Sequence, residues 1–183
     1  HVGMPAEITQ DADRVARADR IIFPGVGAAH SAMATLNRTG LADALRAAFA
    51  KGTPILGICL GCQVVLGHSE EGDVDTLGLA PGRVRRFRLA DKALKIPHMG
   101  WNAIEIRRPH PILNRLENGY EFYFVHSFHP CDVPEENICA VTEYEITFPS
   151  AIAHGNLFAT QFHPEKSGRF GLTLLENFMR WKP

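Results

Sequence analysis

The residues with the clearest chemical potential are a cysteine in a glycine-flanked turn and a histidine far along the chain. Cys59 ends the apolar run 54–58, and His163 is followed by Pro164 and Glu165. A thiolate nucleophile, an imidazole that exchanges its proton and a carboxylate that orients the imidazole make up a Cys-His-Glu triad. The sequence therefore predicts Cys59 as nucleophile, His163 as general base and acid, and Glu165 as the group that orients the histidine.

The residues around the cysteine are those of a nucleophile elbow. Gly57 and Gly61 stand two residues before and after Cys59, so the backbone can turn sharply and lift the thiol above a sheet edge. The Leu60 N–H would then point at a reacting carbonyl oxygen, and the helix that begins here would present its positive end to the thiol. A buried structural cysteine at a strand end is the competing interpretation.

A second glycine turn, Pro24-Gly25-Val26-Gly27, follows the apolar run 20–23. Such a turn leaves backbone N–H groups free to meet an anion or an oxyanion. Taken alone, it is better interpreted as an ordinary connection from a strand to a helix.

The elements that must position these residues are short and alternate in type. Buried strands are expected at 20–23 and 54–58, and helices at 41–49 and 59–66, with Gly52 as a stop signal after the first. Strand, helix and strand at these intervals predict a parallel α/β sheet.

The second half of the chain is rich in strand patterns, which predict antiparallel or mixed pairing in addition to the parallel sheet. Gly155-Asn156 is expected to form a hairpin turn between the last two strands, and a final helix is expected at 168–181. The strand patterns lie at 83–89, 103–107, 121–125, 138–141, 150–154 and 157–162.

The bulk properties restrict the class of protein. The chain has 183 residues, of which 45% are hydrophobic, and this size and composition indicate one compact domain. Its net charge of −1 does not indicate a nucleic-acid or membrane partner. Four cysteines without matched metal spacing fit a reducing cytoplasmic setting, and we expect no metal and no cofactor. The pair Cys59 and Cys62 also permits a redox or half-zinc interpretation, which the remaining cysteines, Cys131 and Cys139, do not support.

Together the three motifs resemble the class I, triad-type glutamine amidotransferases. Within that class the chain resembles the family of glutaminase subunits of imidazole glycerol phosphate synthase, in order and over nearly its whole length. The segments that carry this likeness are 24–27, 57–61, 69–72, 97–102, 123–127 and 161–167, of which Pro97-His98-Met99-Gly100-Trp101-Asn102 and the 24–27 turn are the specific ones. The resemblance implies a three-layer α/β fold in a single domain, 1–183.

The resemblance also implies roles for residues of this chain. Glutamine would be hydrolysed at Cys59, and ammonia would pass to a partner cyclase with a (β/α)8 barrel. The oxyanion hole would be formed by Leu60 and the turn Gly25, Val26 and Gly27. Glutamine would be held by Gln63, Glu71, His126, Ser127 and Phe128. The partner would meet His98, Met99, Trp101, Asn102 and Lys166.

Three departures from the family pattern stand out. The family begins with a strand, a glycine-rich Asp-Tyr-Gly segment and a helix, whereas this chain begins at the expected second strand, around Pro5–Thr9. We therefore expect the opening strand-helix unit to be absent. Cys62 stands where the family has Met, and Phe128 stands where it has Tyr, which removes one hydroxyl.

Two other functions remain open at this level. Another class I amidotransferase is one, although the segments 24–27 and 97–102 argue against it. A non-catalytic binding or regulatory relative that keeps the fold is the other, although the intact Cys59, His163 and Glu165 argue against it.

Overall fold

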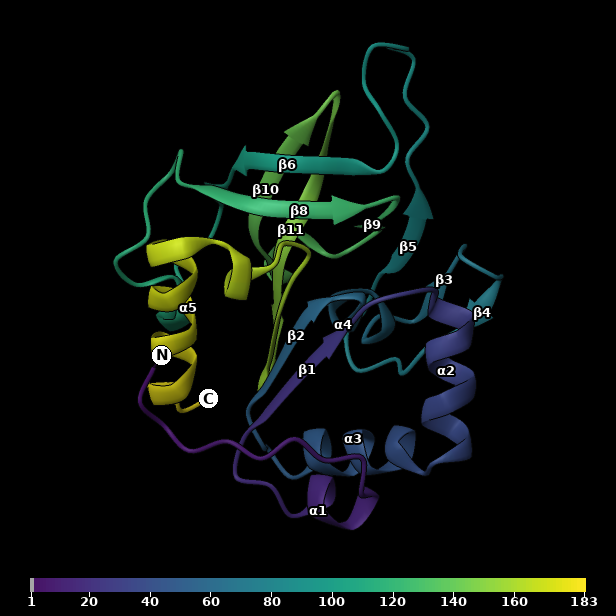
Figure 1. The fold of residues 1–183 in the computed structure, drawn as a ribbon, viewed down its shortest axis with the longest axis vertical. Coiled ribbons are helices and arrows are strands. Elements are labelled where there is room, and N and C mark those ends of the chain that lie inside the picture. The colour runs from purple at the N-terminus through teal and green to yellow at the C-terminus, as the bar shows by residue number, and fades with distance from the viewer. Residues whose placement is uncertain (1) are drawn as a thin grey trace.

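The computed structural model describes residues 2–183 and has a central sheet with helices on both sides (Figure 1). Its six strands run in the order β1-β2-β12-β11-β10-β7. They are β1 (Ile21–Gly25), β2 (Ile55–Cys59), β12 (Leu157–Thr160), β11 (Ile146–His154), β10 (Ile138–Tyr144) and β7 (Glu105–Ile106). The first three are parallel and the other three pair antiparallel. The predicted α/β fold with a mixed sheet is confirmed.

The central strand β2 positions the cysteine. All five of its residues are buried, which a continuous apolar run permits when a parallel sheet is covered on both faces. Gly25, at the end of β1, pairs with Cys59, and Thr160, at the end of β12, pairs with Ile58. The carboxyl ends of three parallel strands therefore meet at one edge, where ligands of open α/β sheets bind.

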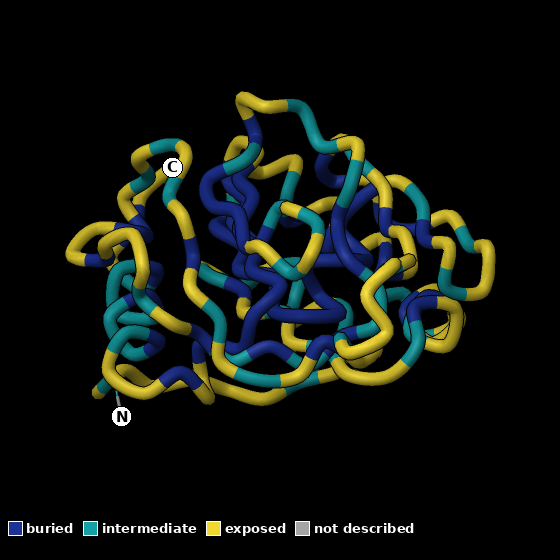
Figure 2. The backbone as a smooth tube through the Cα atoms, turned by 90° about the horizontal axis from the view of Figure 1, so that it is seen from above, coloured by how far each residue is buried: buried dark blue, intermediate teal, exposed yellow. Residues whose placement is uncertain are grey.

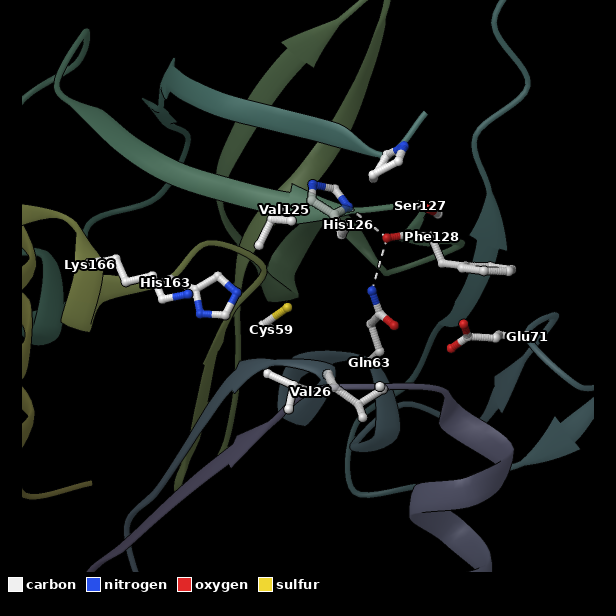
Figure 3. Close-up of a pocket in the computed structure, with 13 residues that line it drawn as sticks. Val26, Cys59, Gln63, Glu71, Val125, His126, Ser127, Phe128, His163 and Lys166 are labelled. Carbon is white, nitrogen blue, oxygen red and sulfur yellow. Dashed lines mark hydrogen bonds between the residues drawn. The ribbon is translucent and has the colours of Figure 1, made fainter. Parts of the chain in front are cut away.

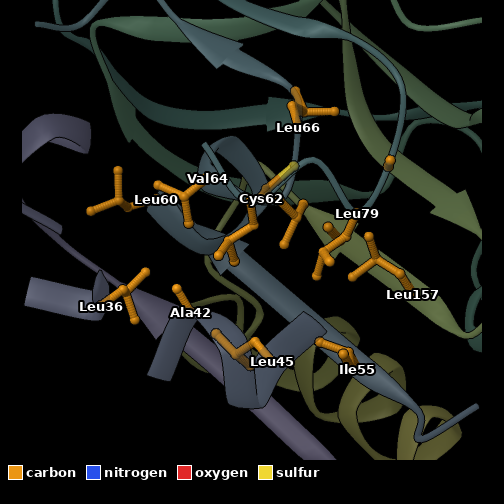
Figure 4. Close-up of a cluster of buried hydrophobic side chains, with 14 of the residues drawn as sticks. Leu36, Ala42, Leu45, Ile55, Leu60, Cys62, Val64, Leu66, Leu79 and Leu157 are labelled. Atoms are coloured by element: carbon orange, nitrogen blue, oxygen red, sulfur yellow. The ribbon is translucent and has the colours of Figure 1, made fainter. Parts of the chain in front are cut away.

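One face of the sheet is covered by the first helices, α1 (Ala12–Ala16), α2 (Ala29–Arg38), α3 (Leu41–Ala50) and α4 (Leu60–Val64). Leu36 and Leu45 pack there with Ile55 and Leu157 in one buried cluster (Figure 4). The predicted helix 41–49 is confirmed, and it ends as expected before Gly52, whose φ is +83°. The predicted helix after Cys59 is shorter than expected, and α2 was not predicted.

The opposite face is covered by α5 (Gly168–Arg180), which confirms the expected final helix. Leu174 and Phe178 are fully buried and Trp181 is 5% exposed, so the apolar stripe is core packing. Each of the two fully buried side chains stabilises the fold by about 1.5–3 kcal/mol. Figure 2 shows buried segments gathered in the interior, with the exposed segments around them.

Two smaller sheets are built from the second half of the chain and the segment after α4. One has the order β4-β3-β5-β9 and the other pairs β6 with β8 antiparallel. Their bounds are β3 (His68–Ser69), β4 (Val74–Asp75), β5 (Arg83–Arg86), β9 (Phe128–Cys131), β6 (His98–Ala103) and β8 (Glu121–His126). Three 3-10 turns, η1 (Pro111–Leu113), η2 (Glu135–Asn137) and η3 (Pro164–Lys166), complete the described elements. Strand β6 was not predicted, because Gly100 and Asn102 are poor strand formers.

The strand expected around Pro5–Thr9 was wrong. Residues 2–11 have no regular secondary structure, and Ile8 is fully exposed. Within residues 2–183, β1 is an edge strand that pairs only with β2, and the segment 5–9 does not pair with its open edge. Pro5 moreover has no N–H to donate to a strand.

The strand expected at 103–107 is divided in two. β6 ends at Ala103 and β7 holds only Glu105 and Ile106, because the chain changes neighbours at Ile104. The Ile104 N–H donates to the carbonyl oxygen of Tyr120, whereas β7 pairs with β10 of the central sheet. The strand expected at 83–89 is likewise shorter and ends at Arg86. The turn at Gly155-Asn156 joins β11 to β12 as predicted.

Candidate active site

Cys59 occupies a strained elbow between β2 and α4. Its φ is 53° and its ψ is −106°, values that a residue with a side chain rarely adopts outside functional sites. A Cβ at Gly61 would lie 2.1 Å from the carbonyl oxygen of Phe23, and a Cβ at Gly57 would lie 3.0 Å from the backbone of Gly61. Only glycine at these positions allows β1 and β2 to approach the turn, so the elbow depends on both.

The 24–27 turn lies beside the elbow, since Gly25 pairs with Cys59. Val26 and Gly27 line the same cavity as Cys59 and Leu60, and Gly27 has a φ of +97°. Gly25 itself does not line the cavity. A Cβ there would meet the Cβ of Leu60 at 3.0 Å, so this glycine allows the turn to approach α4 closely. Of the four residues expected to form an oxyanion hole, Val26, Gly27 and Leu60 therefore line the cavity with Cys59, and Gly25 pairs with Cys59.

His163 reaches the same edge from the end of the neighbouring strand β12. Its Nδ1 lies 2.7 Å from Oε1 of Glu165, and because a carboxylate only accepts, Nδ1 carries the hydrogen. Its Nε2 is buried and makes no hydrogen bond to any of residues 2–183. The imidazole lies next to Cys59, and both side chains line the cavity (Figure 3). Nε2 is therefore the nitrogen available to the thiol and to substrate.

The charges of this group favour an imidazolium. The pKa of His163 is raised from 6.5 to about 9, by the Cys59 thiol and then by the Glu165 carboxylate, against the lowering effect of burial. The Glu165 contribution is the better defined, because no hydrogen bond joins Nε2 to Sγ in this conformation. Partial burial raises the pKa of Glu165, but the hydrogen bond from His163, a backbone hydrogen bond and the charges of His163 and Lys166 together outweigh it, so the net pKa is lowered.

The cavity at this edge has a volume of about 320 Å³ (Figure 3). All five residues expected to hold glutamine line it, and so do the thiol and the imidazole. The lining comprises Val26, Gly27, Cys59, Leu60, Gln63, Glu71, Pro97, Val125, His126, Ser127, Phe128, His163 and Lys166. Pro97 and Val125 were not singled out from the sequence, although both lie within segments that carried the resemblance.

Two polar lining residues are held in defined orientations. Glu71 accepts the backbone N–H of Ala29 at the start of α2 through Oε2, 2.8 Å away, which fixes its carboxylate at the cavity. His126 places Nδ1 2.7 Å from the carbonyl oxygen of Phe128, and burial lowers its pKa to about 3. His126 is therefore a neutral imidazole that donates from Nδ1.

The expected partner contacts divide between the two faces of β6. Met99 and Trp101 are 61% and 52% exposed, as alternation on a strand predicts for one face. His98, also expected at the partner contact, is 1% exposed and does not belong to this exposed face. It points into the core, where Nδ1 lies 3.1 Å from Nε2 of His126 and Nε2 lies 2.7 Å from the side chain of Asn102.

Lys166 is exposed and lies near the outward face of β6. Its Nζ stands 5.6 Å from the ring centroid of Tyr123, and the Tyr123 ring meets Trp101 edge-on at 6.0 Å. Lys166 also lines the cavity. Lys166 thus lies both in the lining of the nucleophile cavity and beside the exposed side chains of β6.

The remaining cysteines do not form a second centre. All four thiols are free, and burial raises the pKa of Cys62 far above its ordinary value, which keeps it a neutral thiol. Among residues 2–183 no cluster of three or more His, Cys, Asp or Glu side chains is placed to hold a metal ion. In the same part of the chain no helix is both long and apolar enough to cross a membrane.

Comparison with known proteins identifies the class and the family of this chain. The family model for "Glutamine amidotransferase class-I" matches residues 2–181, which defines the class of the chain. The imidazole glycerol phosphate synthase subunit HisH of Thiobacillus denitrificans is 46% identical over 182 residues, which are 96% of this chain and 79% of that protein. The corresponding subunit of Nitratidesulfovibrio vulgaris is 48% identical, over 99% of this chain and 87% of that one. Within class I, the chain belongs to the HisH family.

Solved structures agree on the fold. A crystal structure of a glutamine amidotransferase superposes with a TM-score of 0.75 at 17% identity, covering 98% of this chain and 87% of that one. The glutaminase domain of Trypanosoma brucei CTPS with bound acivicin gives a TM-score of 0.62 at 19% identity, covering 94% and 76%. At these identities the likeness shows the fold alone.

Proposed function

We propose that this chain hydrolyses glutamine at Cys59 and supplies the ammonia to a cyclase with a (β/α)8 barrel, for imidazole glycerol phosphate synthesis in histidine biosynthesis. One observation carries the proposal. Three strand ends bring the strained Cys59, the His163–Glu165 pair and the glycine turn of 24–27 around a single cavity of about 320 Å³. The names of the HisH relatives support the pathway and the existence of a partner subunit.

The first half of the reaction releases ammonia. The Cys59 thiolate attacks the side-chain amide carbon of glutamine, and the carbonyl oxygen becomes an oxyanion. Backbone N–H groups of Leu60 and of the 25–27 turn stabilise that charge. His163, protonated because its pKa is raised to about 9, gives its proton to the leaving nitrogen. Ammonia departs and a thioester remains on Cys59.

The second half regenerates the thiol. His163, now neutral, takes a proton from water as the water attacks the thioester carbon. The C–S bond breaks, glutamate leaves, and the proton on His163 again balances the thiolate. Glu165 holds the ring in the required tautomer through both halves, because its bond to Nδ1 leaves Nε2 free for the reacting atoms. The sum is glutamine and water converted to glutamate and ammonia.

The far end of the cavity suits the amino-acid end of glutamine. The Glu71 carboxylate lines the cavity and would pair with the α-ammonium, a charge-assisted contact stronger than a neutral hydrogen bond. Gln63, His126, Ser127 and Phe128 line the space between this carboxylate and the nucleophile. A substrate that lacks the α-ammonium should therefore bind poorly.

The outward face of β6 is the proposed cyclase contact. Met99 and Trp101 expose apolar and aromatic surface of the kind enriched at interfaces, and Lys166 borders it. Asn102 is half-buried at the margin, whereas His98 supports the strand from inside. One domain carrying both the cavity and this face would bring ammonia release close to the partner. The four free cysteines support a reducing cytoplasmic location.

Covalent labelling tests the proposed function directly. Acivicin, an electrophilic amino acid, should label Cys59, as located by peptide mass spectrometry, and Cys59→Ala should abolish the adduct. Ammonia release from glutamine should then be measured for the chain alone and with the liganded cyclase, which we expect to stimulate it strongly. A folded protein that shows neither label nor ammonia release would be a non-catalytic relative.

A further inference from the structure

Gln161 is a buried polar residue that the sequence reasoning did not assign a role. It follows β12, lies two residues before His163 and is fully buried. Its side-chain amide contacts two residues of the proposed site. Oε1 lies 3.0 Å from Nε2 of Gln63, and Nε2 lies 3.8 Å from Sγ of Cys59. One amide therefore bridges the nucleophile and a residue of the glutamine pocket.

A backbone carbonyl determines which way both amides point. The oxygen of Phe128 accepts from Nε2 of Gln63 at 2.9 Å and from Nδ1 of His126 at 2.7 Å. A carbonyl oxygen can only accept, so the Gln63 nitrogen must face it. The second N–H of that nitrogen requires an acceptor, which is Oε1 of Gln161. The nitrogen of Gln161 is thereby turned toward Sγ of Cys59.

The arrangement has a consequence for glutamine binding. With both N–H groups of Gln63 occupied, its carbonyl oxygen is the atom left for the cavity that it lines. In Figure 3 this oxygen lies on the side of Gln63 that faces Glu71. Two acceptors on the same side of the cavity suit a ligand ammonium group. A reversed Gln63 amide would instead present a donor there.

The arrangement also has a consequence for the nucleophile. An N–H that donates to sulfur stabilises the thiolate over the thiol, because the hydrogen bond is stronger to the charged form. Other titratable groups lie around the same sulfur and must be considered together with Gln161. They are His163 on η3's N-terminal side, Cys62 on α4, Glu165 behind His163, and Glu71, His126 and Lys166 across the cavity.

We propose that Gln161 is a positioning residue, whose amide holds the Gln63 carbonyl toward the substrate ammonium and donates a hydrogen bond to the Cys59 thiolate. This inference rests on the proposed function, in which Cys59 is the nucleophile. It explains why a polar side chain is buried within the apolar segment 157–162.

Two substitutions separate the two contacts. Gln161→Glu keeps an acceptor for Gln63 but removes the donor and adds negative charge beside Sγ. Gln161→Met keeps the approximate volume and removes both contacts. Ser150→Ala is the matched control, because Ser150 is buried on the adjacent strand, accepts the Gln161 N–H through its backbone, and has a hydroxyl without a partner among residues 2–183.

The readouts are the pH profile of Cys59 alkylation by iodoacetamide and the steady-state constants with the liganded cyclase. Both Gln161 variants should move the alkylation profile up by about one pH unit, and kcat/KM at neutral pH should fall about tenfold or more. KM for glutamine should rise about tenfold in Gln161→Met but change less than about threefold in Gln161→Glu. Ser150→Ala should match the wild type in all three.

A wild-type measurement covers the case in which a variant does not fold. The side-chain amide protons of Gln161, observed by 15N NMR, should shift over the pH range in which Cys59 alkylation titrates, and this shift should vanish in Cys59→Ala. Folded variants with wild-type profiles and KM, or amide signals insensitive to that titration, would overturn the proposal. Acivicin labelling of the wild type is performed first. If acivicin does not label the wild type, the proposed function is wrong. If acivicin labels the wild type but the Gln161 variants behave like it, only the role of Gln161 is wrong.

Discussion

Nδ1 of His98 lies 3.1 Å from Nε2 of His126, which joins the buried side of β6 to the wall of the glutamine cavity. His126 donates from Nδ1 to Phe128, so its Nε2 accepts and His98 donates from Nδ1. Nε2 of this neutral His98 then accepts, so the Asn102 amide must turn its NH2 group, and not Oδ1, toward it. Burial lowers the pKa of both imidazoles, which keeps them neutral near pH 7. Strand β6, which exposes Trp101 to solvent, is thus joined to the cavity wall by the hydrogen bond between His98 and His126.

We expect His98→Phe to lower the free energy of unfolding by about 1–3 kcal/mol, because Nε2 of His126 would be left buried without a partner. The ring would still stack on Tyr144, whose centroid is 4.0 Å from that of His98, so the loss reports the hydrogen bond and not a cavity. Urea unfolding measures it. Met99→Ala, next on the strand but exposed, should change stability by less than about 0.5 kcal/mol. Equal losses in the two variants would contradict this assignment.

Cys59→Ala should abolish glutamine-dependent synthase activity while activity with added ammonium is retained. The reason is that the thiol reacts only with glutamine and takes no part in the cyclase step. Assays of the assembled synthase with either nitrogen source measure both activities. Cys62→Ala, which removes a neutral buried thiol three residues away, should retain both. Loss of both activities in Cys59→Ala would mean that the residue is structural.

Glu165→Gln should lower the pKa of His163 from about 9 toward 6.5, since the carboxylate favours the imidazolium. NMR titration of the imidazole measures the change. The folded-state pKa lies above the unfolded value, so the stability this group contributes is fully present below about pH 6.5 and is lost as the pH rises through 9. The variant should therefore lose less stability than the wild type over that interval. An unchanged imidazole pKa would show that Cys59 alone raises it. Glu136→Gln, at an exposed glutamate, serves as the control and should leave the pKa of His163 unchanged.

Gly61→Ala should destabilise the fold by about 2–4 kcal/mol or prevent folding, because its Cβ would overlap the carbonyl oxygen of Phe23 at 2.1 Å and neither backbone can yield cheaply. Thermal unfolding measures the loss. Gly119→Ala is the matched control: its φ is +88° but no atom lies within 4 Å of the added Cβ. It should cost about 1 kcal/mol. Gly61 has no positive φ, so a loss no larger than that of Gly119→Ala would show that close approach to Phe23 does not explain why residue 61 is glycine.

Trp101→Ala should weaken binding to the cyclase about thirtyfold, the loss expected for an aromatic anchor at the centre of an interface. Stability should hardly change, because the side chain is 52% exposed in the free chain. Titration calorimetry with the cyclase measures the affinity. Ile8→Ala, at a fully exposed residue of the segment 2–11, should bind as the wild type does. Unchanged affinity in Trp101→Ala would remove this face from the proposed interface.

Features that depend on a few consecutive residues could be predicted from the sequence. The elbow at Cys59 is local, since glycine two residues to each side is what allows its positive φ and the close approach of β1. The His163–Glu165 contact is local as well, because Pro164 starts a tight turn that brings the two side chains together. Strand β2 was predicted because a strand covered on both faces is apolar at every position. Strand β1 was also predicted, but its expected burial was wrong, because Ile22 is 43% exposed on this edge strand and only Ile21 is buried.

Features that depend on packing between distant segments were decided by the tertiary structure. The chain has nine histidines, and pairing along β12 and β2 is what selects His163 to stand beside the thiol. Burial of His98 follows from which face of β6 packs against the core, which the motif did not reveal. The segment 5–9 leaves Ile8 fully exposed and does not pair with the open edge of β1, which its composition did not reveal.

Gln161 shows the division most clearly. The sequence by itself determined that a polar residue precedes Phe162 and His163, and it determined the reactive residues through their local turns. Only the tertiary structure decided that its amide would meet both Gln63 and Cys59, which lie about a hundred residues earlier in the chain. The physical reason is that backbone turns are set by neighbours in sequence, whereas hydrogen bonds between buried side chains are set by strand order and register.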